Sequence, residues 1–205
     1  MKKTILFLIL FLFVSCLFGQ VRSPMVFSPK SYILQDTIDV AGTPITYTDN
    51  THILSMNAVI KNSSTACNAI NISGDSVVFV GNITIIGTNV NFGIHLLGND
   101  CEISGVTVVN PIKHAIHIQG DRNQITNSTM SADSTIYSGI YIMGSSANTN
   151  ISNCNISGFS YSVEENDIGT CTYTIVSGCQ LKNNLIRPSV HFRSGSYSII
   201  VGSVE

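Results

Sequence analysis

The sequence has few charged residues and no tryptophan. Only 11% of its 205 residues are charged, where ordinary globular domains have roughly a quarter. The formal net charge is -2, which gives no reason to expect nucleic acid or an anionic membrane surface as a partner. Ser, Thr and Asn are abundant, so we expect a surface dominated by hydroxyl and amide groups.

Helical periodicity and metal-binding cysteine motifs are also missing. No repeat described below contains the apolar stripe of a helix. Six cysteines are present, but no pair has zinc-ligand spacing and no CxxC motif occurs. We therefore expect no cofactor and no metal site.

Two sets of residues recur along the chain at matching intervals. An aliphatic residue opens a short apolar-x-apolar triplet every 22 to 27 residues, beginning at Ile45, Ile70, Ile94, Ile116, Ile140, Val163 and Val190. Asn or Gly follows each by 11 to 15 residues, at Asn57, Asn82, Gly105, Asn127, Asn153, Gly178 and Gly202. A period of this length predicts a solenoid, in which stacked repeats bury one another's apolar faces.

The triplets have the alternation of short β-strands. Ile94-His-Leu96 and Ile116-His-Ile118 place apolar residues two apart and favour β-branched side chains. Gly and Asn tolerate the left-handed backbone region that a sharp bend between strands needs. Asn side chains on successive coils can also bond to one another along the axis.

This combination resembles the right-handed parallel β-helix of the pectin-lyase-like superfamily, from about Ile45 to the C-terminus. The resemblance implies an all-β, right-handed, single-stranded parallel β-helix of about seven coils. We assign residues 45–205 to the repeats and residues 20–44 to an N-terminal cap and lead-in strand. The resemblance concerns the repeat alone, because the arginine base with an acidic calcium cluster of pectate lyases and the aspartate motifs of polygalacturonases are not visible.

The N-terminus has the order of a secretory signal peptide. Lys2 and Lys3 precede an apolar run over residues 5–14, and Gly19 offers a processing site. We expect a signal peptide over residues 1–19, no membrane span, and a secreted or cell-surface protein. A lipid anchor on Cys16 is the second interpretation, because Phe13 fits the lipobox poorly.

Cleavage after Gly19 would leave five cysteines, an odd number. Cys154 and Cys179 directly follow Asn153 and Gly178, so they should stack on neighbouring coils, close enough for a disulfide. The better supported interpretation is that they are thiols filling an apolar core column.

Outward positions of the triplets form a polar column. The residues are Thr46, Asn71, His95, His117, Tyr141, Glu164 and His191, and two positions further on lie Thr48, Ser73, Leu97, Gln119, Met143, Asn166 and Arg193. The candidate ligand-binding residues are His95, His117, Tyr141, Glu164, His191 and Arg193. Saccharides bind through hydrogen bonds and aromatic stacking, so this face suits an extended polysaccharide. The competing interpretation, favoured for any single residue, is an ordinary solvated sheet face.

Three functions remain open from these residues. We favour a secreted or surface β-helix that binds or displays saccharide without catalysis. A polysaccharide lyase or glycoside hydrolase that uses the His, Tyr and Glu side chains for acid and base chemistry is the first alternative. The second is a structural or adhesive surface module. Catalytic residues are not identified.

Glu165 occupies a position where an inward aliphatic residue is expected, which indicates a register change or a strained functional point.

The C-terminal repeat stops in mid-coil at Glu205, where the six preceding coils have an apolar residue. Solenoid ends expose backbone groups and an apolar cross-section, so we expect this end to be covered by a second subunit or by sequence that follows.

Sedimentation of residues 20–205 tests whether a second subunit covers this end, because self-association predicts an apparent mass that rises with protein concentration. A stable monomer at every concentration would contradict it.

Overall fold

A computed structural model describes residues 30–133, 137–143, 146–166, 173–183, 188–192 and 198–202. These residues contain strands and no helix. The strands are β1 (Ser31–Asp39), β2 (Ile45–Tyr47), β3 (His52–Lys61), β4 (Ile70–Ile72), β5 (Val78–Ile86), β6 (Ile94–Leu96), β7 (Glu102–Val109), β8 (Ile116–Ile118), β9 (Gln124–Thr126), β10 (Thr129–Ser131), β11 (Ser138–Ile142), β12 (Asn150–Ser152), β13 (Asn155–Phe159), β14 (Tyr161–Glu165), β15 (Ile175–Ser177), β16 (Gln180–Asn183), β17 (Val190–His191) and β18 (Ile199–Val201).

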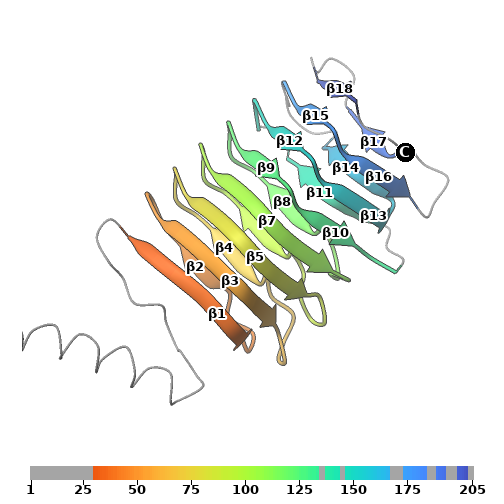
Figure 1. Ribbon diagram of the computed structural model, residues 1–205. Helices are drawn as coiled ribbons and strands as arrows, with labels where there is room; N and C mark the ends of the chain where they lie inside the picture. The colour runs from red at the N-terminus through yellow and green to blue at the C-terminus, as the bar shows by residue number, and fades with distance from the viewer. Residues whose placement is uncertain are drawn as a thin grey trace, which may run out of the picture.

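The strands form two parallel sheets that run the length of the molecule (Figure 1). The triplet sheet contains the seven triplet strands in the order β2-β4-β6-β8-β11-β14-β17. The bend sheet contains the other eleven, beginning at β1 and ending at β18. The chain alternates between the sheets and advances one strand position per turn, which makes a parallel β-solenoid of about six turns. The sequence-based prediction of the fold is confirmed.

The triplets stack in the predicted register. Ile94, Ile116 and Ile140 are direct partners on β6, β8 and β11, and all three are fully buried. A second inward column lies in the bend sheet, where every member is buried: Ile60, Ile85, Val108, Met130, Ile156 and Leu181. Aliphatic side chains from both sheets therefore fill one continuous core between the sheets.

The Asn and Gly residues lie at a bend within the second sheet. Asn57, Gly105, Asn127 and Asn153 have positive φ angles of 58°, 79°, 50° and 53°. In β5 the prediction is wrong by one residue, because Gly81 and not Asn82 has the positive φ, at 121°. A Cβ at Gly81 would lie 2.2 Å from the carbonyl oxygen of Ser55, so the bend passes too close to the preceding coil for any other residue.

Amide stacking at this bend is confirmed in one place. The side-chain amide of Asn82 donates to Oδ1 of Asn57 at 3.4 Å. Further along the solenoid, Asn127 donates instead to the hydroxyl of Ser104 at 3.4 Å, because Gly105 has no side chain to accept a bond. The bend residues are therefore selected first for backbone conformation and only second for side-chain pairing.

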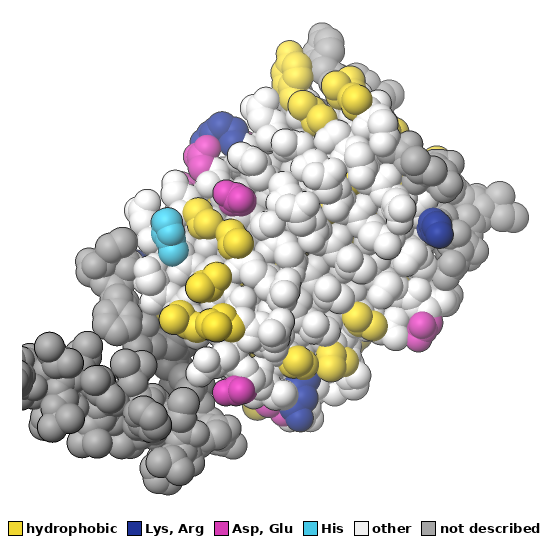
Figure 2. Space-filling view, in the orientation of Figure 1, with side chains coloured by type: hydrophobic (Ala, Val, Ile, Leu, Met, Phe, Trp, Pro, Cys, Tyr) yellow, Lys and Arg dark blue, Asp and Glu magenta, His cyan; other side chains and the backbone are white. Residues whose placement is uncertain are grey.

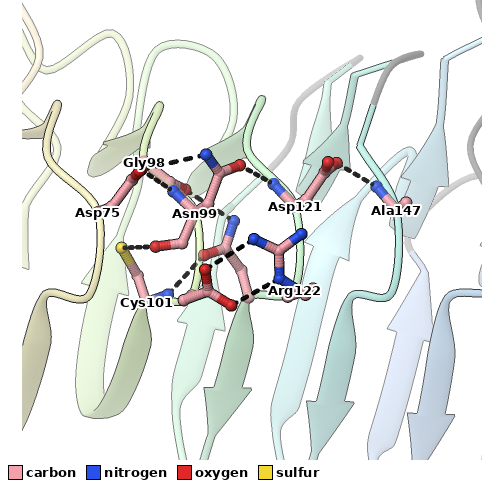
Figure 3. Close-up of polar contacts among 9 residues, drawn as sticks. Asp75, Gly98, Asn99, Cys101, Asp121, Arg122 and Ala147 are labelled. Atoms are coloured by element: carbon pink, nitrogen blue, oxygen red, sulfur yellow. Dashed lines mark hydrogen bonds and ion pairs between the residues drawn. The ribbon is translucent and has the colours of Figure 1, made fainter.

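A polar ladder along one edge of the solenoid was not predicted. In Figure 3, Oδ1 of Asp75 accepts the backbone N–H of Asn99 at 2.7 Å, and Oδ1 of Asn99 accepts that of Asp121 at 2.7 Å. Asp121 in turn accepts the backbone N–H of Ala147 at 2.7 Å. Each coil thus supplies an acceptor for a backbone donor of the next coil, which the turn would otherwise leave unpaired.

Asn123 joins neighbouring coils on the inner side of the same edge. It is fully buried, accepts the backbone N–H of Cys101 at 2.9 Å and donates to the carbonyl oxygen of Gly98 at 3.0 Å. On the outer side, Arg122 forms a two-point ion pair with Asp100 at 2.7 Å. Because this pair is half exposed, Asn123 contributes more to stability than the ion pair does.

Glu165 lies in the core without a register change. It pairs with Ile142 in the expected position, and its side chain is fully buried. Its Oε1 accepts a hydrogen bond from the hydroxyl of Ser198 at 2.6 Å, and the same hydroxyl oxygen accepts the backbone N–H of Thr174 at 3.0 Å. The buried carboxylate therefore links the residue just before β18 to the inside of an earlier coil.

The last described strand is exposed. Ile199, Ile200 and Val201 of β18 are 50–53% accessible, and Ile200 is in register with the fully buried core residue Val176. Among the described residues no helix is long and apolar enough to cross a membrane.

Ile116→Ala should lower the free energy of unfolding by about 2–5 kcal/mol, because it leaves a cavity between coils. Urea unfolding followed by circular dichroism measures the change. Ile86→Ala is the matched control, because Ile86 is 41% exposed and its truncation should cost much less. Equal losses from both variants would show that Ile116 does not lie in the core.

Candidate functional site

The predicted polar column lies along the outside of the triplet sheet. Its seven residues are direct partners on neighbouring strands: Thr46, Asn71, His95, His117, Tyr141, Glu164 and His191. Thr46 is exposed, His117 is 92% buried and the other five are partly buried. The column is therefore packed against its neighbours. We call its five members from His95 to His191 the strip.

A second, flanking column supports the strip and was not predicted. Phe92, His114 and Tyr161 each stand two residues before a triplet, as do Asn68 and Ser138. The aromatic members contact the strip from positions that precede the triplets, outside the alternating residues on which the prediction was based. A signal was present, because three of these five residues have rings at the same offset.

The rings of the two columns pack against one another. His95 and His117 are stacked, with centroids 4.9 Å apart and planes 7° apart. Phe92 contacts both, with its centroid 5.3 Å from His95 and 4.6 Å from His117. Tyr141 stacks on His114 at 4.4 Å. These five rings form one cluster that spans three coils, and the imidazole faces are covered by other rings.

Hydrogen bonds fix the C-terminal side of this cluster. Nδ1 of His114 lies 3.1 Å from the backbone nitrogen and 3.3 Å from the carbonyl oxygen of Ser138, so it pairs with the backbone of Ser138 in either tautomer. The hydroxyl of Ser138 donates to Oε2 of Glu164. His114, Ser138 and Glu164 thereby connect three consecutive coils, and Glu164 is held as a hydrogen-bond acceptor beside Tyr141.

The remaining predicted residues have different surroundings. His191 stacks on Tyr161 with centroids 5.1 Å apart. Arg193 lies outside the described residues. In the second outward set, Leu97 and Met143 are 39% and 38% exposed, and the amide of Gln119 donates to the sulfur of Met143. The structure therefore brings His95, His117 and Tyr141 together as predicted.

The imidazoles of the cluster are neutral at pH 7. Burial, with smaller contributions from the neighbouring His95, His114 and Lys113, lowers the pKa of His117 to about 3. Burial also lowers the pKa of His114 to about 4, although its bond with the backbone of Ser138 opposes the shift. The pKa of His95 is lowered by burial as well. The rings thus present neutral nitrogen atoms.

Two of these nitrogen atoms, Nδ1 of His117 and Nε2 of His95, have no hydrogen-bond partner among the described residues. Both atoms are buried. An unpaired buried polar group costs about 1–3 kcal/mol.

Neither a metal site nor a similar known protein indicates a function for the strip. Within the described ranges, no group of three or more His, Cys, Asp or Glu side chains is placed to hold a metal ion. Comparison with protein-family models, with curated proteins and with solved structures found no match. The geometry of the strip is therefore the feature that bears on function.

The lowered pKa values predict that stability falls in mild acid. Below about pH 6.5 the unfolded chain binds protons at these imidazoles, whereas folded His114 and His117 remain neutral until about pH 4 and pH 3. Each of them should therefore reduce the free energy of unfolding by up to about 1.4 kcal/mol per pH unit within that window. Urea unfolding at pH 7, 6 and 5 measures this slope.

His117→Phe should make the slope shallower, because the ring remains but cannot bind a proton. Tyr141→Phe is the control and should leave the slope unchanged, since it removes a hydroxyl and no imidazole. A slope that His117→Phe does not alter would show that folded His117 binds protons as readily as the unfolded chain does.

Proposed function

We propose that this protein is an extracytoplasmic β-helix, of the pectin-lyase-like kind without that superfamily's catalytic motifs, which binds or displays saccharide through the strip. The observation that carries the proposal is Nδ1 of His117, a buried nitrogen without a described partner at the centre of an aligned polar column. A buried polar group without a hydrogen-bond partner lowers the stability of the fold, so its presence indicates a role other than stability. A bound ligand would supply the missing partner.

The spacing of the strip suits a polymer. Parallel neighbours repeat every 4.7–4.9 Å or so, so His95, His117 and Tyr141 present polar groups at regular intervals along the axis. The ring faces of this cluster lie against other rings. Recognition would therefore use the nitrogen and hydroxyl edges of the rings as hydrogen-bonding groups, and stacking on sugar faces would contribute less.

A non-catalytic role fits the strip better than hydrolysis. Most glycoside hydrolases use two carboxyl groups on either side of the bond that is cleaved. Glu164 is the only carboxylate in the described part of the strip, and it already accepts a hydrogen bond from Ser138. A lyase remains the first alternative, because a neutral imidazole next to Tyr141 could act as a base.

One observation favours an adhesive role as the second candidate. Ile33, Leu54 and Val80 are in register on the outer face of the bend sheet and are 58%, 49% and 37% exposed. Met56, on the same strand as Leu54, is 58% exposed. Figure 2 shows hydrophobic side chains gathered near the N-terminal strands. An apolar patch of this kind is typical of protein-protein contacts.

A glycan array and a product assay on the same polysaccharides separate the three functions. A binding protein predicts retention on a glycan without products, and an enzyme predicts shortened or unsaturated oligosaccharides. An adhesive module predicts neither result. Absence of both retention and products would contradict the saccharide proposal.

The triple variant His95→Phe, His117→Phe and Tyr141→Phe tests the strip directly. It keeps the rings and removes their polar edges, so glycan retention should fall at least tenfold while the fold persists. The matched control is Thr84→Val, Thr107→Val and Thr129→Val, three partners aligned on the outer face of the bend sheet. Unchanged retention by the Phe variant, with its circular dichroism spectrum preserved, would exclude the strip.

A further inference from the structure

Two buried cysteines face each other across neighbouring coils. Cys154 lies between β12 and β13, and Cys179 lies between β15 and β16. The strands on both sides pair in register, Ser152 with Ser177 and Asn155 with Gln180, so the cysteines occupy equivalent positions. Their accessible fractions are 2% and 1%, and neither forms a disulfide in this structure.

The sulfur of Cys179 is directed toward the coil of Cys154. It accepts the backbone N–H of Cys154 at 3.4 Å. Ser128 occupies the same position in an earlier coil, and its hydroxyl accepts the backbone N–H of Val106 at 3.2 Å. At this bend, therefore, a side-chain atom from the next coil bonds the backbone of the previous one. Between Cys154 and Cys179 the acceptor is a thiol, and the residue at the equivalent position of the previous coil is also a cysteine.

The separation of the two backbones suits a covalent bond. In-register neighbours in a parallel sheet lie about 4.8 Å apart, within the range of about 4.4–6.8 Å between Cα atoms in disulfides. Both side chains point into the core. We infer that Cys154 and Cys179 form a modification site, at which a disulfide oxidant creates a covalent cross-link between two neighbouring coils.

The two thiols have different reactivities. The thiol and the backbone N–H of Cys154 both donate toward Cys179, which lowers the pKa of the Cys179 thiol. The same contact, together with burial, raises the pKa of Cys154. Because the backbone N–H of Cys154 is directed at Sγ of Cys179 and would stabilise a thiolate there, Cys179 is the nucleophile of the pair and Cys154 is the resolving thiol.

The reaction is a pair of thiol-disulfide exchanges. The Cys179 thiolate attacks one sulfur of an external disulfide such as oxidised glutathione, which forms a mixed disulfide and releases one thiol. Cys154 then loses its proton and attacks the Cys179 sulfur, which releases the second thiol. The protein loses two hydrogen atoms and two electrons go to the oxidant. Because both sulfurs are buried, the oxidant needs local opening of these coils.

The experiment uses the full chain. Reduced, folded protein is incubated in glutathione buffers of increasing oxidising potential, the free thiols are alkylated, and the digested protein is analysed by mass spectrometry. The inference predicts a linked peptide pair containing Cys154 and Cys179, two fewer alkylated thiols, and a melting temperature that rises on oxidation. Free Cys154 and Cys179 in the most oxidising buffer, or linkage of either to another cysteine, would overturn it.

Variants separate this cross-link from other thiol chemistry. Cys179→Ser should abolish the linked pair and the rise in melting temperature. Cys101→Ser is the matched control, because Cys101 is also 1% exposed but lies in a different column, and it should preserve both. Loss of the linked Cys154–Cys179 peptide in the Cys101 variant would show that Cys101 takes part in the exchange, which would overturn a direct reaction between Cys179 and Cys154. The wild-type peptide map remains decisive even if a serine variant folds poorly.

Discussion

In-register stacking of parallel strands is the constraint on which the rest of this molecule depends. It places the same position of every coil in one column, so any residue that suits one coil must also suit its neighbours above and below. Inward columns are therefore filled mainly by well-packed apolar side chains such as Ile94, Ile116 and Ile140, and the buried Glu165 needs a hydrogen-bond partner. At the turns the same constraint leaves backbone donors facing the next coil, and the side chains of Asp75, Asn99 and Asp121 satisfy them.

The apolar columns were predictable from the sequence, whereas the polar contacts between coils were mostly not. Every triplet strand was found in the predicted register, because alternation and period are properties of the sequence itself. Gly81 took the left-handed position in place of Asn82, because the choice depends on the distance to Ser55 in the preceding coil. Glu165 kept its register because Ser198, 33 residues later, donates a hydrogen bond to it, and no local pattern indicates such a distant partner.

The same distinction applies to the candidate site. Alternation placed His95, His117 and Tyr141 in one column correctly, but it gave no information on how their rings are oriented. That orientation depends on Phe92 and His114 in the flanking column, whose rings cover the faces of their neighbours. Burial by these rings also sets the charge state, because a desolvated imidazole stays neutral. The sequence therefore predicted which side chains share this column, but not how their rings are arranged.

The strip and the core are built from the same strands, so the proposed binding and the stability of the fold would depend on the same elements. His117 stands between Ile116 and Ile118, both fully buried, so the core fixes the position of the ring before any ligand arrives. A site held in this way loses little conformational entropy on binding. The proposed cross-link would extend this effect, because β13 leads directly into β14 with Glu164, and β16 precedes β17 with His191. Oxidation of Cys154 and Cys179 would then tighten the coils that carry the C-terminal half of the strip, where the described chain ends in exposed β18.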